Sequence, residues 1–153
     1  MKTLFLNIMF LGILAGCIQL PVSVKGNHFR FENFRTTDKN PAELVSLMCF
    51  RKKPSYRIEP KQFVSGENSL WLLATIEGNE NMYLAKEAVA NFNITLDAGK
   101  SYMANRIIQQ GNISMWIQEV DTGLIVSDIV NKELSCPTFK GNLREKQCKS
   151  GTL

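Results

Sequence analysis

The chain has 153 residues, with 18 basic and 14 acidic side chains and a formal net charge of +4. A surplus this small and this dispersed argues against nucleic acid as a partner. The length suits one domain with a substantial apolar core.

The first residues have the pattern of an export signal. Lys2 precedes an apolar run over residues 4–14, and the small residues Ala15 and Gly16 lead to Cys17. The run is too short for a transmembrane helix, which needs about 20 apolar residues. The pattern therefore predicts a signal peptide over residues 1–16 that is removed from the mature protein.

The order Leu14-Ala15-Gly16-Cys17 resembles the lipobox of bacterial lipoproteins. In that family a diacylglycerol is attached to the cysteine thiol, the chain is cut before the cysteine, and the new amine is acylated. The resemblance implies that Cys17 is a lipidated N-terminus. An aspartate after the cysteine retains such proteins at the inner membrane, and here that residue is Ile18. The resemblance thus implies the outer membrane, periplasmic side. An ordinary secretory signal is the alternative.

Residues 17–40 contain Pro21, Gly26 and scattered charge, and we interpret them as a tether. Phe29 and Phe31 alternate with charged neighbours, which predicts a short strand that docks on the domain. The next stretch is ambiguous, because Asn40 could cap a helix whereas residues 44–50 also suit a buried strand. We favour the strand, since the residues that follow are β-like.

Residues 70–130 predict an antiparallel meander. Bulky residues fill 70–76, and alternating apolar residues follow over 92–96 and 113–117. Turn-forming clusters with glycine at 99, 111 and 123 separate these runs, the last leading into a strand at 124–126. We therefore expect an all-β fold, a small antiparallel β-sandwich over residues 41–148, followed by a flexible tail at 149–153.

The stretch over residues 92–102 resembles the hairpin of small β-sandwich modules found in bacterial lipoproteins of unassigned function. The shared features are a strand, an Ala-Gly-Lys turn at 98–100, and Tyr102 in the returning strand. The resemblance covers roughly residues 68–130. It supports the fold and location, and it carries over no catalytic residues.

Besides Cys17, the chain has three cysteines, Cys49, Cys136 and Cys148. An exported domain meets an oxidising compartment, so we expect one disulfide and one remaining thiol. We favour the pair closest in sequence, Cys136 with Cys148. Pairing of Cys49 with either of them would instead attach the C-terminal segment to the body. None of the spacings fits a zinc site.

Nothing in the sequence predicts an enzyme, a cofactor or a metal. Asp121-Thr122-Gly123 matches the aspartic-protease triplet, but that chemistry needs a second carboxylate at close range, and the triplet is also an ordinary turn. His28 is the sole histidine and has no nucleophile near it in sequence.

Trp116 is the candidate for a binding residue. It alternates with Ser114 and Gln118, which predicts that it lies on the wetter face of its strand. An exposed tryptophan on a sheet is a candidate contact. We therefore expect a lipid-anchored, non-enzymatic envelope protein that binds another protein or a cell-wall polymer. The alternative is an inhibitor of a periplasmic, lysozyme-like hydrolase.

Overall fold

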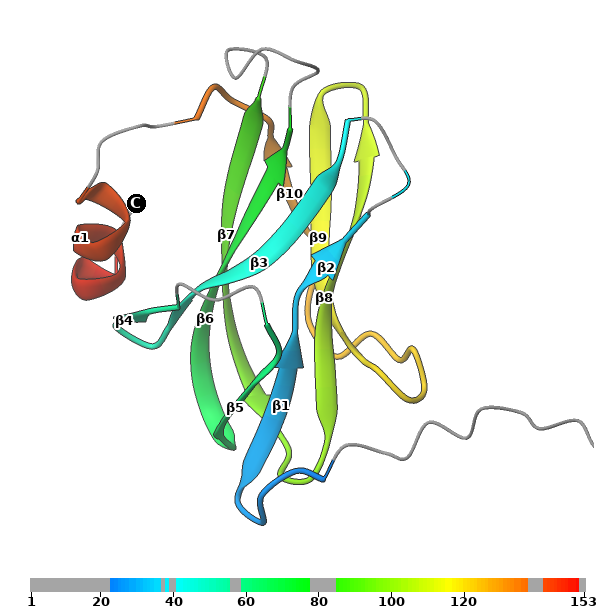
Figure 1. Cartoon of the computed structure of the whole chain (residues 1–153), viewed down its shortest axis with the longest axis vertical. Coiled ribbons are helices and arrows are strands. Elements are labelled where there is room, and N and C mark those ends of the chain that lie inside the picture. Colours follow the sequence, from blue (N-terminus) through cyan, green and yellow to red (C-terminus); the bar gives the residue numbers. More distant parts are fainter. Residues whose placement is uncertain are drawn as a thin grey trace, which may run out of the picture.

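The computed structural model describes residues 23–36, 38, 41–55, 59–77, 85–137 and 142–151. Two mostly antiparallel sheets pack face to face, and one short helix lies outside them (Figure 1). The predicted all-β sandwich is confirmed.

The first sheet, sheet A, has the strand order β10-β9-β8-β1-β5. Its centre is the hairpin of β8 and β9, which pair antiparallel along their whole length. Strand β1 joins this hairpin by parallel pairing with β8 and pairs antiparallel with β5 on its other side. The strands are β1 (His28–Glu32), β5 (Lys61–Val64), β8 (Ser101–Gln109), β9 (Asn112–Glu119) and β10 (Val130–Glu133).

The second sheet, sheet B, has the order β2-β3-β6-β7, and the short strand β4 pairs with β3. Strands β6 and β7 are the longest and pair in continuous register. Strand β3 confirms the predicted strand over residues 44–50. The strands are β2 (Phe34–Arg35), β3 (Glu43–Phe50), β4 (Lys53–Pro54), β6 (Gly66–Ile76) and β7 (Lys86–Leu96).

The main core lies between the two sheets and follows from the period-two patterns. In β6 the side chains of Asn68, Leu70, Leu72 and Ala74 are buried, and those between them are less so. Because successive side chains of a strand point to opposite faces, these alternations direct one face of each sheet inward. The fully buried large side chains of this core include Phe29, Phe31, Val45, Leu70, Leu72, Leu96, Ile113, Met115 and Ile117.

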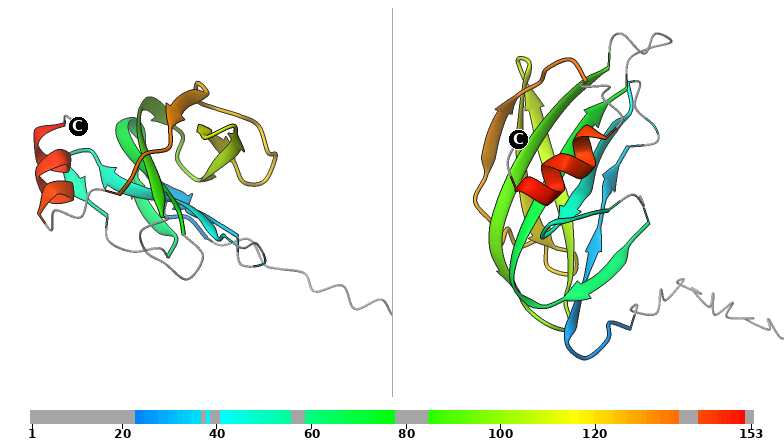
Figure 2. Two further views of the ribbon diagram at one scale, coloured as in Figure 1. Left: turned by 90° about the horizontal axis from the view of Figure 1, so that it is seen from above. Right: turned by 90° about the vertical axis from the view of Figure 1, so that its left-hand side faces the viewer.

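The helix α1 (Leu143–Ser150) lies across the outer face of sheet B, as Figure 2 shows. It ends at Gly151, whose positive φ of 70° lets its N–H reach the Gln147 carbonyl. Its buried residue Cys148 joins Met48 and Cys49 in a second small core, against which Trp71, Leu73 and Val89 pack. A disulfide between Cys49 and Cys148 links the helix to β3.

Three boundaries differ from the sequence predictions. Strands β1 and β2 belong to the sheets, so residues 28–35 are part of the sandwich and not of a tether over 17–40. The strand expected at 124–126 is a single bridge between Ile125 and Gln118, and β10 takes the place beside β9 instead. The flexible tail expected at 149–153 begins inside α1, which extends to Ser150. The disulfide holds this helix against the sheet.

Candidate functional site

Strand β7 forms one edge of sheet B, and its pairing with β6 runs without a bulge from Lys86 to Leu96. Glu87 exchanges both backbone hydrogen bonds with Ser135, so its N–H and C=O point away from β6. Backbone direction in a strand repeats every second residue. The N–H and C=O of Val89, Asn91 and Asn93 therefore point to the same free edge, and so do those of Thr95.

In the part of the chain that the structure describes, this edge is open over most of its length, and the Glu87–Ser135 bridge is the one backbone pairing across it. The interior of β7 has no proline and no lysine between residues 87 and 96. Proline, lysine and bulges are devices by which proteins protect exposed edges, so the edge of β7 is available for pairing.

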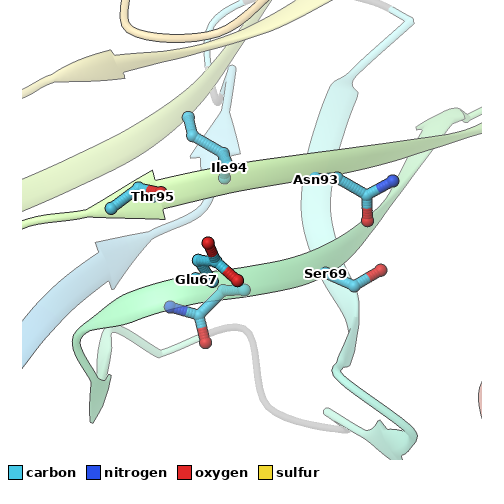
Figure 3. A pocket seen from close by; sticks show the side chains of 6 residues that line it. Glu67, Ser69, Asn93, Ile94 and Thr95 are labelled. Carbon is cyan, nitrogen blue, oxygen red and sulfur yellow. The ribbon is translucent and has the colours of Figure 1, made fainter.

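The outer face beside this edge carries a polar row (Figure 3). Ser69 of β6 lies opposite Asn93 of β7, and Glu67 lies opposite Thr95. Asn91 extends the row, since its Nδ2 donates to Ser69 Oγ at 3.0 Å. These strands line an open hollow of about 410 Å³, bounded by Glu67, Asn68, Ser69, Asn93, Ile94 and Thr95.

A second hollow of about 540 Å³ lies on the other side of the β7 edge, between this strand and the segment that leads into β10. Its wall on that side is Ile125, Val126, Ser127, Asp128 and Val130. Ile125 is 45 % exposed. Asn93 and Ile94 line both hollows, so the edge of β7 separates two mainly polar hollows, the second of which also has Ile125 and Val130 in its wall.

Trp116 is not the exposed contact that the sequence predicted. It is 9 % exposed, and its Nε1 donates to Gln118 Oε1 at 3.0 Å. Asn105 Nδ2 donates to the same oxygen at 2.9 Å. The acceptor Gln118 lies two residues further along the same face of the strand. This hydrogen bond holds the indole ring over its own strand, so the ring does not project into solvent. The alternation with Ser114 and Gln118 could not reveal this hydrogen bond.

The predicted Cys136–Cys148 disulfide is also wrong. Cys148 bonds to Cys49, with their Cα atoms 5.6 Å apart, and Cys136 is an exposed free thiol. The reason is an irregularity in β3, where the register with β6 shifts between Leu47 and Cys49. The shift places Cys49 opposite Trp71, under α1, and closeness in sequence therefore gave the wrong partner.

Two basic side chains, Arg106 and Lys100, form ion pairs that join separate segments of the sandwich. The Arg106 guanidinium lies 3.9 Å from the centre of the Phe34 ring and pairs with the Glu43 carboxylate, which joins β8 to β2 and β3. Burial lowers the pKa of Arg106. At the β7–β8 turn, Lys100 Nζ lies 3.5 Å from Glu119 Oε1, and this carboxylate is the main cause that raises the pKa of Lys100.

The described residues contain no group of three or more His, Cys, Asp or Glu side chains that could hold a metal ion. Within the same residues, no helix is long and apolar enough to cross a membrane. Cys17 and the signal peptide predicted over residues 1–16 lie outside the described residues.

No family model matches the chain, and no curated protein or solved structure matches it.

Proposed function

We propose that this protein is a lipid-anchored component of the bacterial cell envelope that binds an extracytoplasmic partner and catalyses no reaction. The observation that carries the proposal is the Cys49–Cys148 disulfide. Disulfides form and persist in oxidising compartments, which supports export. Export agrees with the signal-like N-terminus, and there the order Leu14-Ala15-Gly16-Cys17 supports a lipid anchor at Cys17.

The anchor would set where the domain acts. Two or more acyl chains hold a protein stably on a membrane, at about 0.8 kcal/mol per buried CH₂. The first strand of the domain, β1, begins at His28, so only a short stretch of chain joins the domain to Cys17. A domain held this close to a membrane surface suits contact with envelope proteins or with cell-wall polymer, and the open edge of β7 supports a protein as the partner.

Fractionation with intact-mass measurement tests the anchor. The full chain should be found in the outer-membrane fraction, with a mass equal to residues 17–153 plus acyl chains and two daltons lower before reduction than after. Cys17→Ser should leave the chain unprocessed or release it from the membrane. Cys136→Ser is the matched control, because it removes the exposed thiol and should leave the fractionation unchanged. Membrane retention of Cys17→Ser with normal cleavage would refute the anchor.

A specific observation also supports inhibition of a lysozyme-like hydrolase. The connection between β9 and β10 extends from the sandwich (Figure 1). Two of its apolar residues are exposed, Leu124 at 63 % and Ile129 at 54 %. A protruding loop with apolar side chains is suited to insertion into an enzyme cleft. Leu124→Asp should then abolish inhibition of a lysozyme in a turbidity assay. Lack of inhibition by the unaltered protein would remove this candidate.

A further inference from the structure

We propose that the free edge of β7 binds an extended segment of a partner protein as an added strand, with a basic side chain of that segment directed at Glu67 or Asp128. This inference rests on the proposed binding function and specifies its site and the chemistry of its partner.

The backbone of β7 provides the first requirement. Val89, Asn91, Asn93 and Thr95 direct their N–H and C=O groups to the edge, as the Glu87–Ser135 bridge establishes. At about 3.4 Å per residue, the stretch from Val89 to Thr95 is roughly 20 Å long and matches a peptide of about seven residues. Strand addition uses main-chain hydrogen bonds of this kind for affinity.

The two hollows provide the second requirement. Alternate side chains of an added strand point to opposite faces of the sheet. One set would lie over the polar row of Ser69, Asn93 and Thr95, and the other set would enter the hollow walled by Ile125 and Val130. The hollows meet at the edge of β7, where such a strand would lie. The segment that fits therefore has polar side chains on one face and, on the other, side chains that contact Ile125 and Val130 among the polar groups of the second hollow.

Charge gives the third requirement. Among the described residues that line the two hollows, Glu67 and Asp128 are the ones with a charged side chain, and both are exposed. A carboxylate on each side of the edge favours lysine or arginine in the partner and disfavours acidic residues.

A second copy of this chain fits the edge less well. The Phe92 side chain of β7 is buried in its own core, and Ile94 packs against that core. A second β7 would therefore bring no free apolar side chain to the wall of Ile125 and Val130. It would also bring a second Glu67 and Asp128 to the surface that carries the first pair, and like charges across an interface are unfavourable.

Synthetic peptides test the proposal on the full chain, purified from whichever fraction contains it. The probe is an acetylated peptide of about eight residues in which valine and lysine alternate, a typical strand length. The matched peptide carries glutamate in place of lysine, and a third is N-methylated at alternate residues so that it cannot donate to a strand edge. Binding is followed by calorimetry and by amide exchange of β7.

The lysine peptide should bind and slow exchange at Val89, Asn91, Asn93 and Thr95. The glutamate and N-methylated peptides should each bind about tenfold or more weakly, equivalent to about 1.4 kcal/mol. Glu67→Gln with Asp128→Asn should remove the preference for lysine over glutamate. Glu133→Gln, which alters an exposed carboxylate on β10 outside both hollows, should leave it unchanged.

Asn93→Pro removes one edge-facing N–H and should weaken the lysine peptide about tenfold. If this variant does not fold, the N-methylated peptide tests the same requirement, main-chain hydrogen bonds at the β7 edge, on the unaltered chain. Binding of lysine peptide without protection at the β7 edge would overturn the proposal, as would no binding at all. A concentration-dependent dimer that protects the same amides without peptide would also overturn it, and would assign the edge to a second copy.

The chain is purified from whichever fraction contains it. The peptide result therefore remains valid even if Cys17 carries no lipid. Soluble protein that binds the lysine peptide would refute the lipid anchor alone. Membrane-anchored protein that binds none of the peptides would refute the β7 site alone.

Discussion

The outer face of sheet B consists of two halves with opposite chemistry. One half carries Met48, Trp71, Leu73 and Val89, and α1 covers it. The other half carries Glu67, Ser69, Asn93 and Thr95, and lines an open hollow. Apart from Met48 of β3, the residues of both halves lie on the same two long strands, β6 and β7, so the difference arises from side chains and not from the backbone. The comparison shows that α1 covers the apolar half and leaves the polar half beside the β7 edge accessible.

The helix is a weak element without this context. It has eight residues, and Cys148 is its buried residue. Isolated helices shorter than about 12 residues are marginal in water. Its position therefore depends on the disulfide to Cys49 and on an ion pair between Arg144 and Glu87.

Loss of the disulfide should have the largest effect on the covered half. Cys49→Ala with Cys148→Ala should lower the free energy of unfolding by about 4.7 kcal/mol, because the cross-link between residues 99 positions apart restricts the unfolded chain. Amide exchange should become fast throughout α1, whereas β8 and β9 stay protected. Urea unfolding and exchange measure the two effects, and Cys136→Ala should match the parent. Continued protection of α1 would contradict this account of the helix.

A pair of substitutions compares the two halves directly. Trp71→Ala should lower the free energy of unfolding by about 2 kcal/mol, below the 3–5 kcal/mol typical of fully buried tryptophan, because this side chain is half-buried. Asn93→Ala, on the adjacent strand of the open half, should change it by about 0.5 kcal/mol or less, the scale of surface substitutions. Equal losses in urea unfolding would mean that the two halves do not differ.

The ion pair of α1 should have a smaller effect. Arg144 and Glu87 retain 24 % and 11 % side-chain exposure, so water screens part of their attraction. Arg144→Met should lower the free energy of unfolding by about 1 kcal/mol and speed exchange in α1. Lys146→Met changes an exposed charge on the same helix and should have no effect on either quantity.

Acidification should give the smallest effect. A hydrogen bond from Lys149 lowers the pKa of Glu145 below its ordinary value of 4.5. Because the folded pKa is lower than the unfolded one, the pair stabilises α1 above the unfolded pKa, and this contribution is lost as pH falls through the folded pKa. Carboxyl titration by NMR should show the lowered pKa, and Lys149→Met should raise it toward the ordinary value. An unchanged pKa in that variant would contradict the assigned cause.

The sandwich was predictable because its signals are local. Alternation in the β7–β9 region predicted strands, and the turn before Lys100 places Gly99 at φ 79°, a conformation that suits glycine. Strand β1 was also expected from Phe29 and Phe31, which the structure buries in the main core.

The outer faces were not predictable, because they depend on contacts between distant residues. The irregularity in β3 has no sequence signal that we identified, yet it directs Cys49 to the outer face. The bond from Trp116 to Gln118 buried the residue that alternation had placed at the surface. The free edge of β7 could not be read from the sequence either, since it follows from the strand order of sheet B.

Amide hydrogen exchange of the full chain tests whether β7 presents an open edge. We expect exchange to alternate along β7, fast at Val89, Asn91, Asn93 and Thr95 and slow at Ala90, Phe92 and Ile94, whose N–H groups point to β6. Uniformly slow exchange from Val89 to Thr95 in the protein alone would show that another strand already covers this edge, and would contradict the proposed site.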